Sequence, residues 1–404
     1  MTADILNNAR DESGRDAVIS KFKKRFNRNP DFISIAPGRV NLIGGHVDYN
    51  GGLVLPVTVN RHTFVAGARG KDLGLLTVHS IRENESFVVD LACPVSPALP
   101  IWTNYVRGVV HGFLKRGIEL PGLEILIDST IPSGSGLSSS ASLEVAIAGI
   151  LEAASGVILK GNEKPKLCQQ AENEFAKVPC GIMDQISVAF GKRDYMLLLD
   201  CRDESIEQIL FDHEHLALAV INSHVRHELS ESEYAIRRES CESISRTLGL
   251  ESLRELTWST LDQLRDKIDK LSFLRAEHVV RENERTLKFV SHMKNADWFQ
   301  AGEVLYESHA SLREKFQVSC VELDKLVGVA RQIGTAGGVL GARMTGAGFG
   351  GCVVMLVERE KASDAVFKVV EDYNKTGAAS SRPRASGFVV DSAEGAQVFK
   401  CNAG

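Results

Sequence analysis

The stretch PSGSGLSSSA occupies residues 132–141, between a predicted strand that ends near Ser129 and a predicted helix over 139–155. Glycines allow the backbone to approach a ligand closely, and the N–H groups and dipole at a helix N-terminus favour a phosphate. No Gly-Lys-Ser/Thr closes the stretch, so it is not the common P-loop. It predicts a phosphate-binding loop of another kind; the alternative is a Ser/Gly-rich loop that only caps the helix.

Two further stretches carry residues suited to ligand binding. RMTGAGFGGC at 343–352 has four glycines within 346–351, an entropic cost that fits a loop pressed against a substrate or against the 132–141 stretch. APGRVNLIGGHVDYNGG at 36–52 places Arg39, His46 and Asp48 between two predicted strands, a set suited to binding hydroxyl groups. The alternatives are a plain glycine-rich turn for the former, and a turn-capping Asp48 with an exposed His46 for the latter.

The hydrophobic periodicity around these stretches predicts an α+β protein of two domains. Strands are expected at 33–36, 53–57, 62–66, 75–79, 87–91, 123–128, 195–200, 217–222, 352–357 and 388–390. Helices are expected at 11–26, 139–155, 164–176, 182–190, from 230 to Leu248, and at 260–270, 273–294, 297–314, 321–334 and 360–375. We place the domains at 1–205 and 206–404 because 404 residues exceed one ordinary domain.

The composition excludes several classes of protein. Hydrophobic residues make up 44% and the formal net charge is -5, so no basic surface for nucleic acid or anionic membrane is expected. The eight cysteines are scattered without a Cys-x-x-Cys pair, which predicts neither a zinc site nor a disulfide framework. No secretory signal or membrane-spanning run is evident. We therefore expect a cytoplasmic protein, and a monomer.

The three stretches, in this order and at these separations, resemble those of the galactokinases in the GHMP small-molecule kinase family. The resemblance runs over nearly the whole chain and includes WTNYV at 102–106, AENEF at 171–175, PCGIMDQ at 179–185 and SEY at 232–234. It implies the two-domain GHMP fold, with an N-terminal lobe like ribosomal protein S5 domain 2 and a ferredoxin-like C-terminal lobe. It also implies transfer of the γ-phosphoryl group of ATP, with Mg²⁺, to the anomeric hydroxyl of galactose.

The resemblance assigns a nucleotide site to the glycine-rich loops. Ser140 and Glu172 are expected to hold Mg²⁺, an ion that prefers oxygen ligands and shares them with phosphate. Trp102 falls in the adenine-proximal segment, although a core tryptophan is the alternative. The implied ATP-binding residues are Trp102, Pro132, Gly134, Ser135, Gly136, Leu137, Ser138, Ser139, Ser140, Gly346 and Gly348.

The resemblance also assigns the catalytic pair and the sugar site. Asp184 matches the catalytic base, which accepts the proton of the anomeric hydroxyl, and Arg39 matches the cation beside it. The residues that match the sugar site are Gly45, His46, Asp48, Gly181 and Tyr234.

Two positions depart from the pattern. Gly45 stands where galactokinases carry a glutamate that contacts the primary alcohol of the sugar, so a galacturonate kinase is an alternative. Against it, no arginine or lysine lies beside Gly45 in the sequence, and Tyr234 is the galactokinase residue. Lys177 replaces a usual glycine and could reach the sugar or face solvent. A non-catalytic sugar and nucleotide sensor is the alternative of another class, but Ser140, Glu172 and Asp184 are all present.

Overall fold

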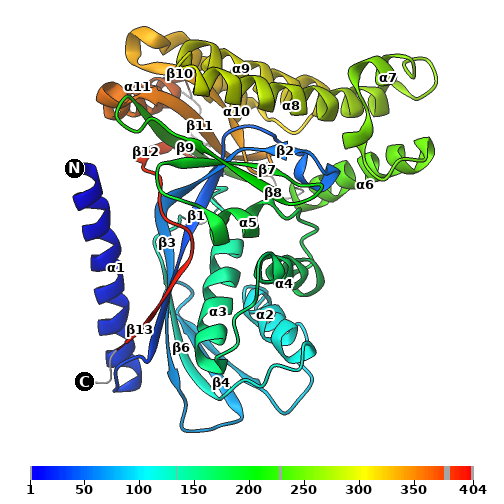
Figure 1. Ribbon diagram of the computed structural model, residues 1–404. Coiled ribbons are helices and arrows are strands. Elements are labelled where there is room, and N and C mark those ends of the chain that lie inside the picture. Colours follow the sequence, from blue (N-terminus) through cyan, green and yellow to red (C-terminus); the bar gives the residue numbers. More distant parts are fainter. Residues whose placement is uncertain (1, 133, 227–229, 377–382, 402–404) are drawn as a thin grey trace.

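The computed structural model describes residues 2–132, 134–226, 230–376 and 383–401. Strands and helices alternate irregularly along the chain, and the strands form three largely antiparallel sheets. Figure 1 shows the largest sheet running through one half of the molecule and a helix-covered second sheet in the other half. The predicted α+β class is confirmed.

The first sheet has six strands and is covered by helices on both faces. Its strand order is β13-β1-β3-β6-β4-β5, and only β4 and β6 pair in parallel. Alternate residues of each strand face opposite layers: Ile33 and Ala66 pack with helix α1, whereas Phe32 and Val65 pack with helix α3. The bounds are β1 Phe32–Asn41, β3 Pro56–Arg69, β4 Leu75–Ser80, β5 Glu85–Asp90, β6 Leu123–Ser129, β13 Gln397–Lys400, α1 Thr2–Phe26, α2 Thr103–Lys115, α3 Ser139–Ser155 and α4 Glu163–Ala171.

Helix α3 is central to the first half because it is apolar on almost every side. It packs against β1, β3, α2 and α4, and Val145, Ile147, Ile150 and Leu151 are all buried. A helix that is hydrophobic all round is stable only inside a core. The packing therefore fixes the position of its N-terminus, which follows the 132–138 loop.

The second half is built on a four-stranded antiparallel sheet in the order β10-β11-β9-β12. Val353 and Met355 of β11 pack with helices α10 and α11, and the alternating Val354 and Leu356 pack with α8 and α9. The bounds are β9 Leu216–Arg226, β10 Val339–Thr345, β11 Gly350–Glu358, β12 Ser386–Val390, α6 Ser230–Leu248, α7 Trp258–Asp262, α8 Lys270–Lys294, α9 Trp298–Ser311, α10 Val321–Ile333 and α11 Ala362–Thr376.

A small third sheet connects the two halves. It contains β2 (Leu53–Val54), β7 (Tyr195–Asp200) and β8 (Ser205–Leu210), and β2 contacts helix α8 of the second half. Helix α5 (Met183–Phe190) lies beneath it, beside α3 and β1. The loop before β2 is therefore held between the two halves.

Several predicted elements differ from the observed ones. The predicted helices 164–176 and 297–314 each end in a π-helical turn, at Glu172–Ala176 and Leu312–Phe316. The predicted helix 260–270 is wrong, because α7 ends at Asp262. Helix α2 and strands β8, β10 and β13 were not predicted. Since β13 pairs with β1, the last strand returns to the first sheet, and the division at residue 205 stays a prediction.

Within the described residues, the helices are all too short or too polar to cross a membrane.

Candidate active site

The carboxylate of Asp184 lies where the 36–52 and 132–141 stretches meet. Asp184 is in the first turn of α5, and Arg39 comes from β1. The Arg39 guanidinium donates two parallel hydrogen bonds to this carboxylate, Nε to Oδ1 and Nη2 to Oδ2, both at 2.8 Å. Ser138 Oγ donates to Oδ2 at 2.5 Å. The bidentate pair and the Ser138 hydroxyl together fix the orientation of the carboxylate.

The 132–138 loop leaves the N-terminus of α3 free of side-chain capping. Ser138 is the N-cap residue, but its hydroxyl bonds to Asp184 and not to the helix. Its φ of 55° is left-handed, a conformation that costs a non-glycine residue about 1 kcal/mol. The uncapped N–H groups of the first turn are suited to bind an anion such as a phosphate.

Backbone hydrogen bonds shape the rest of the 132–138 loop. Ser135 Oγ donates to Pro132 O at 2.7 Å, Arg39 Nη1 to Gly136 O at 2.6 Å, and Arg39 N to Leu137 O at 3.0 Å. Gly134 and Gly136 have φ of 64° and 66°. Leu137 is buried, and Ser133 lies outside the described residues.

The second glycine-rich stretch packs directly on this loop. A Cβ built on Gly136 would lie 3.5 Å from Thr345 O and 3.9 Å from Gly346 Cα. Gly346 and Gly348 have φ of 83° and 84°, which an L-residue rarely adopts. The expectation that this stretch lies against the first loop is confirmed.

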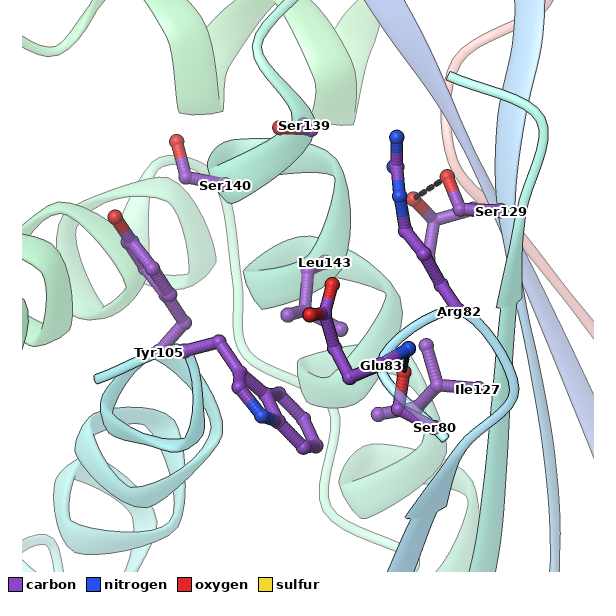
Figure 2. A pocket seen from close by; sticks show the side chains of 11 residues that line it. Ser80, Arg82, Glu83, Tyr105, Ile127, Ser129, Ser139, Ser140 and Leu143 are labelled. Atoms are coloured by element: carbon purple, nitrogen blue, oxygen red, sulfur yellow. Dashed lines mark hydrogen bonds between the residues drawn. The ribbon is translucent and has the colours of Figure 1, made fainter. Parts of the chain in front are cut away.

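A cavity of about 150 Å³ opens beside the N-terminus of α3 (Figure 2). Three of the predicted nucleotide-binding residues line it: Trp102, Ser139 and Ser140. Trp102 is not a core residue: its Nε1 donates to Glu85 Oε2 at 2.8 Å and its ring packs edge-on against Phe87. The other lining residues are Thr63, Ser80, Arg82, Glu83, Tyr105, Ile127, Ser129 and Leu143.

Acidic side chains gather behind the cavity. Glu172 begins the π-helical turn, hydrogen bonds with Ser140, and accepts from Gln185 Nε2 at 2.6 Å. Burial, together with the charge of Asp184, raises the pKa of Glu172 to about 7. Gln185 Nε2 also donates to Glu144 at 3.1 Å, and Glu144 Oε1 is buried without a partner.

This donor set fits Mg²⁺. The hydroxyl of Ser140 and the carboxylate of Glu172 are hard oxygen donors, and buried carboxylates that repel one another are stabilised by a cation. Among the described residues, no group of three or more His, Cys, Asp or Glu side chains could hold a metal by itself. Mg²⁺ usually completes its coordination with phosphate and water, so it does not require three protein ligands.

The 42–52 loop presents His46 and Asp48 on the opposite side of Asp184. His46 Nε2 donates to Ala347 O at 3.0 Å, so Nδ1 accepts from the hydroxyl of Tyr49 at 2.9 Å. Burial lowers the pKa of His46 to about 3, which keeps the ring neutral. The ring centroids of Tyr234 and Phe316 lie 5.4 and 5.1 Å from that of His46.

Asp48 and Gly181 lie in contact. A Cβ on Gly181 would collide with Asp48 Oδ2, so only glycine leaves this carboxylate in place. Burial raises the pKa of Asp48 to about 6, and the charge of Asp184 adds to the rise. Burial also raises the pKa of Tyr234, which stays a neutral phenol. Two carboxylates, a neutral imidazole and two phenol groups thus lie close together, a set suited to a polyol.

Gly45 has a cation beside it in space. A Cβ on Gly45 would collide with Nη2 of Arg343, a residue 1% exposed, and would lie 3.2 Å from Leu312. Arg343 is distant from Gly45 in the sequence, and β10 brings it across from the second half. Arg343 is engaged elsewhere: Nε donates to Met344 O at 2.9 Å and Nη1 to Leu42 O at 3.2 Å.

Known proteins resemble this chain in sequence over nearly its whole length. It is 41% identical over 388 residues to a human galactokinase, covering 94% of this chain and 95% of the relative, and 40% identical to a bovine galactokinase with the same coverage. The galactokinase galactose-binding signature matches residues 20–69, and the GHMP kinase N-terminal and C-terminal domains match 104–192 and 290–375. The chain belongs to the galactokinase family.

Solved structures agree with this assignment. A Lactococcus lactis galactokinase complexed with galactose has a TM-score of 0.88 at 32% identity, with 95% of this chain and 99% of the other covered. A mevalonate kinase has a TM-score of 0.61 at 19% identity, with 89% and 98% covered, which is a likeness of fold alone. The predicted two-domain GHMP kinase fold is thus confirmed for this galactokinase-family chain.

Sequence reasoning missed several residues around the site. Ser138 was assigned to ATP, but in the structure it bonds to Asp184. Gln185 and Glu144 behind Glu172, and Glu282 and Arg343 behind the 42–52 loop, were not singled out. Glu144 lies in an otherwise apolar helical run, and a charge in such a run is the one signal that could have marked it. Lys177 is exposed at the end of its π-helical turn.

Proposed function

We propose that this chain is an ATP-dependent galactose kinase that transfers the γ-phosphoryl group of ATP to O1 of α-D-galactose. The observation that carries the proposal is the Asp184 carboxylate, held by Arg39 and Ser138 between the hydroxyl-binding side chains of the 42–52 loop and the uncapped N-terminus of α3. A sugar hydroxyl and a nucleotide phosphate can meet only at such a point. The family membership supports the same reaction.

In the proposed reaction, Asp184 accepts the proton of the O1 hydroxyl while O1 attacks the γ-phosphorus. The bond from O1 to phosphorus forms, the bond to the β-γ bridging oxygen breaks, and ADP leaves with that electron pair. Arg39 fixes the orientation of the Asp184 carboxylate before the transfer and offsets negative charge near it. The N–H groups at the start of α3, with Gly134 and Gly136 of the loop, bind the phosphates.

The geometry of the site supports the remaining assignments of the proposal. Asp48 and Tyr234 bind sugar hydroxyls, and Trp102 forms a wall of the nucleotide cavity. Ser140 and Glu172 would hold Mg²⁺, which when bound neutralises charge on the β- and γ-phosphates. Both sides of the site come from one chain, which supports a monomer as the active unit. The cytoplasmic location stays a prediction from the sequence.

Galactose is the proposed substrate in preference to galacturonate. A uronic acid would need a free cation near Gly45, and Arg343 there already donates to two carbonyl groups and lies 3.5 Å from Glu282. The sensor alternative has no support in the geometry, because the expected catalytic and metal-binding groups are present and lie together.

Coupled measurement of ADP release tests the proposal. The purified chain is supplied with MgATP and, in turn, galactose, galacturonate, N-acetylgalactosamine and glucose. We expect the largest kcat/KM with galactose. Preference for galacturonate would contradict the substrate assignment and would indicate that Arg343 binds the carboxylate of the sugar. Sugar binding without ADP release would favour the sensor.

A further inference from the structure

One face of helix α8 hydrogen bonds to the backbone of the loop that carries His46 and Asp48. Glu282 Oε1 accepts from the N–H groups of Gly44 and Gly45, both at 3.2 Å. His278 Nε2 donates to Gly45 O at 2.9 Å. Leu53 N, just beyond the loop, donates to Asn283 Oδ1 at 2.7 Å. The helix belongs to the second half of the chain and the loop to the first.

Glu282 is the centre of this contact. Its side chain is fully buried, and Oε1 also accepts from Ser308 Oγ at 2.6 Å, while Oε2 accepts from Arg285 Nε at 2.7 Å. Burial favours the neutral acid, but the cations of Arg285 and Arg343 hold the pKa of Glu282 below its ordinary value. The residue is therefore an anion that two successive N–H groups of the loop enclose.

The two enclosed N–H groups lie directly before the proposed sugar-binding side chains. Gly45 is followed by His46, whose φ of 59° is left-handed, and then by Asp48. The residues from Leu42 to Val47 are buried and closely packed. A rotation of the Gly44 and Gly45 peptides would therefore move the residues that follow them. The orientation of those peptides fixes where the imidazole and the carboxylate point.

We infer that Glu282 is a positioning residue for the sugar: it holds the Gly44–Gly45 peptides so that Asp48 faces the substrate and His46 keeps its hydrogen bonds to Tyr49 and Ala347. The inference rests on the proposed function and deepens it, because it assigns a part in orienting the sugar site to a residue that acts through the loop backbone. Among the described residues, the hydrogen bonds of Glu282 do not reach the 132–138 loop, which contacts the second half where Gly134 and Gly136 lie against Gly351, Thr345 and Gly346. Its loss should therefore affect the sugar and not the nucleotide.

The test compares two Glu→Gln changes on the same helix. Glu282→Gln removes the buried charge, whereas Glu284→Gln changes an exposed residue that pairs with Arg281. We expect Glu282→Gln to raise KM for galactose about 10- to 100-fold, as for loss of charge-assisted hydrogen bonds, with KM for MgATP within twofold of wild type. Glu284→Gln should change neither constant.

Further variants separate positioning from folding. Glu282→Asp keeps the charge and should restore part of the galactose affinity. Ser308→Ala removes one donor to Glu282 without removing a charge, so it keeps the inference testable if Glu282→Gln does not fold, and it should raise KM for galactose about threefold or more. Equal changes in both KM values, or a fall in kcat alone that follows the folded fraction, would overturn the inference.

The wild-type arm tests the proposed function separately. If the wild type phosphorylates another sugar, the proposed substrate fails, and the comparison of variants is repeated with that sugar. If galactose is the substrate and Glu282→Gln leaves its KM unchanged, the positioning role fails while the function stands.

Discussion

The two loops that meet at Asp184 are held in different ways. The 42–52 loop is enclosed by buried side chains of α8, with Glu282 and His278 bonded to its backbone. The 132–138 loop is shaped by its own glycines and by Arg39, and it touches the second half through the backbones of Thr345 and Gly346. The side chains of the 42–52 loop are therefore oriented before the sugar binds. The 132–138 loop instead offers backbone N–H groups whose hydrogen bonds are made only when a phosphate binds.

This difference separates the two substrates. Binding to an oriented site avoids the entropic cost of ordering side chains, so the sugar side owes its affinity to preorganised hydrogen bonds. Nucleotide binding instead depends on the backbone N–H groups at the start of α3, on the ring of Trp102 and on the proposed Mg²⁺. A substitution on the sugar side should accordingly change KM for galactose, and one on the nucleotide side should change KM for MgATP. Only a substitution of Asp184, which lies between the two sides, should lower kcat without changing either KM.

The largest effect on activity is expected from a substitution of Asp184. Asp184→Asn keeps the shape and can keep a bond to Arg39, but an amide cannot take the proton of O1. We expect kcat to fall by about 10³-fold or more, with galactose and ATP binding within a few-fold by calorimetry. Activity within tenfold of wild type would show that Asp184 is not the base.

Asp48→Ala tests the sugar side. It removes a carboxylate that accepts from sugar hydroxyls, so KM for galactose should rise about 10- to 100-fold while KM for MgATP stays within twofold. Steady-state kinetics with each substrate varied in turn gives both constants. A larger rise for MgATP than for galactose would reverse the assignment of the two loops.

Trp102→Ala is the matched change on the nucleotide side. It removes a wall of the cavity beside α3, and KM for MgATP should rise about tenfold, as expected when about 1.5 kcal/mol of aromatic contact is lost. KM for galactose should not change. An unchanged KM for MgATP would place the adenine elsewhere.

The pH dependence of galactose binding should follow Asp48. Burial raises its pKa to about 6, so the carboxylate becomes protonated as the pH falls through 6 and loses acceptor capacity. Affinity for galactose should be level above pH 7 and should fall about fivefold between pH 6 and pH 5. His46, with a pKa of about 3, contributes nothing in this range. Persistence of the acid limb in Asp48→Asn would assign it to another group.

The smallest effect is expected at the ends of the two π-helical turns. Lys177 and Gln317 are both exposed and both left-handed, with φ of 63° and 60°. Replacing either with glycine removes the cost of a Cβ there and should raise the free energy of unfolding by about 0.5–1 kcal/mol, without changing kcat or either KM. Chemical denaturation measures the free energy of unfolding, and steady-state kinetics measures kcat and the two KM values. A change in galactose KM for Lys177→Gly alone would show that this side chain reaches the sugar.

The fold was predictable where the sequence pattern is local. Helix α3 was predicted with its observed bounds because apolar residues predominate between Leu143 and Ala154. Helix α2 was missed because glycines interrupt it. A Cβ on Gly108 would collide with Ala171, and one on Gly112 with Leu167, so these glycines serve a close helix contact that only the tertiary structure shows.

The site residues were likewise predictable where they lie in short sequence motifs. Arg39 and Asp48 were singled out from their own stretch, Asp184 was assigned from the family resemblance, and the three residues do lie together. Glu282 and Arg343 were not found, because charged residues in a helix or beside a glycine-rich loop usually face solvent. Their role depends on the packing of the second half against the first, which no local pattern records.

Product analysis tests the central claim most directly. The chain is incubated with MgATP and galactose, and the product is examined by ³¹P and ¹H NMR. The account predicts one phosphate ester whose phosphorus couples to the anomeric proton of α-galactose. A phosphate on any other hydroxyl, or ATP hydrolysis to inorganic phosphate without a sugar ester, would contradict it.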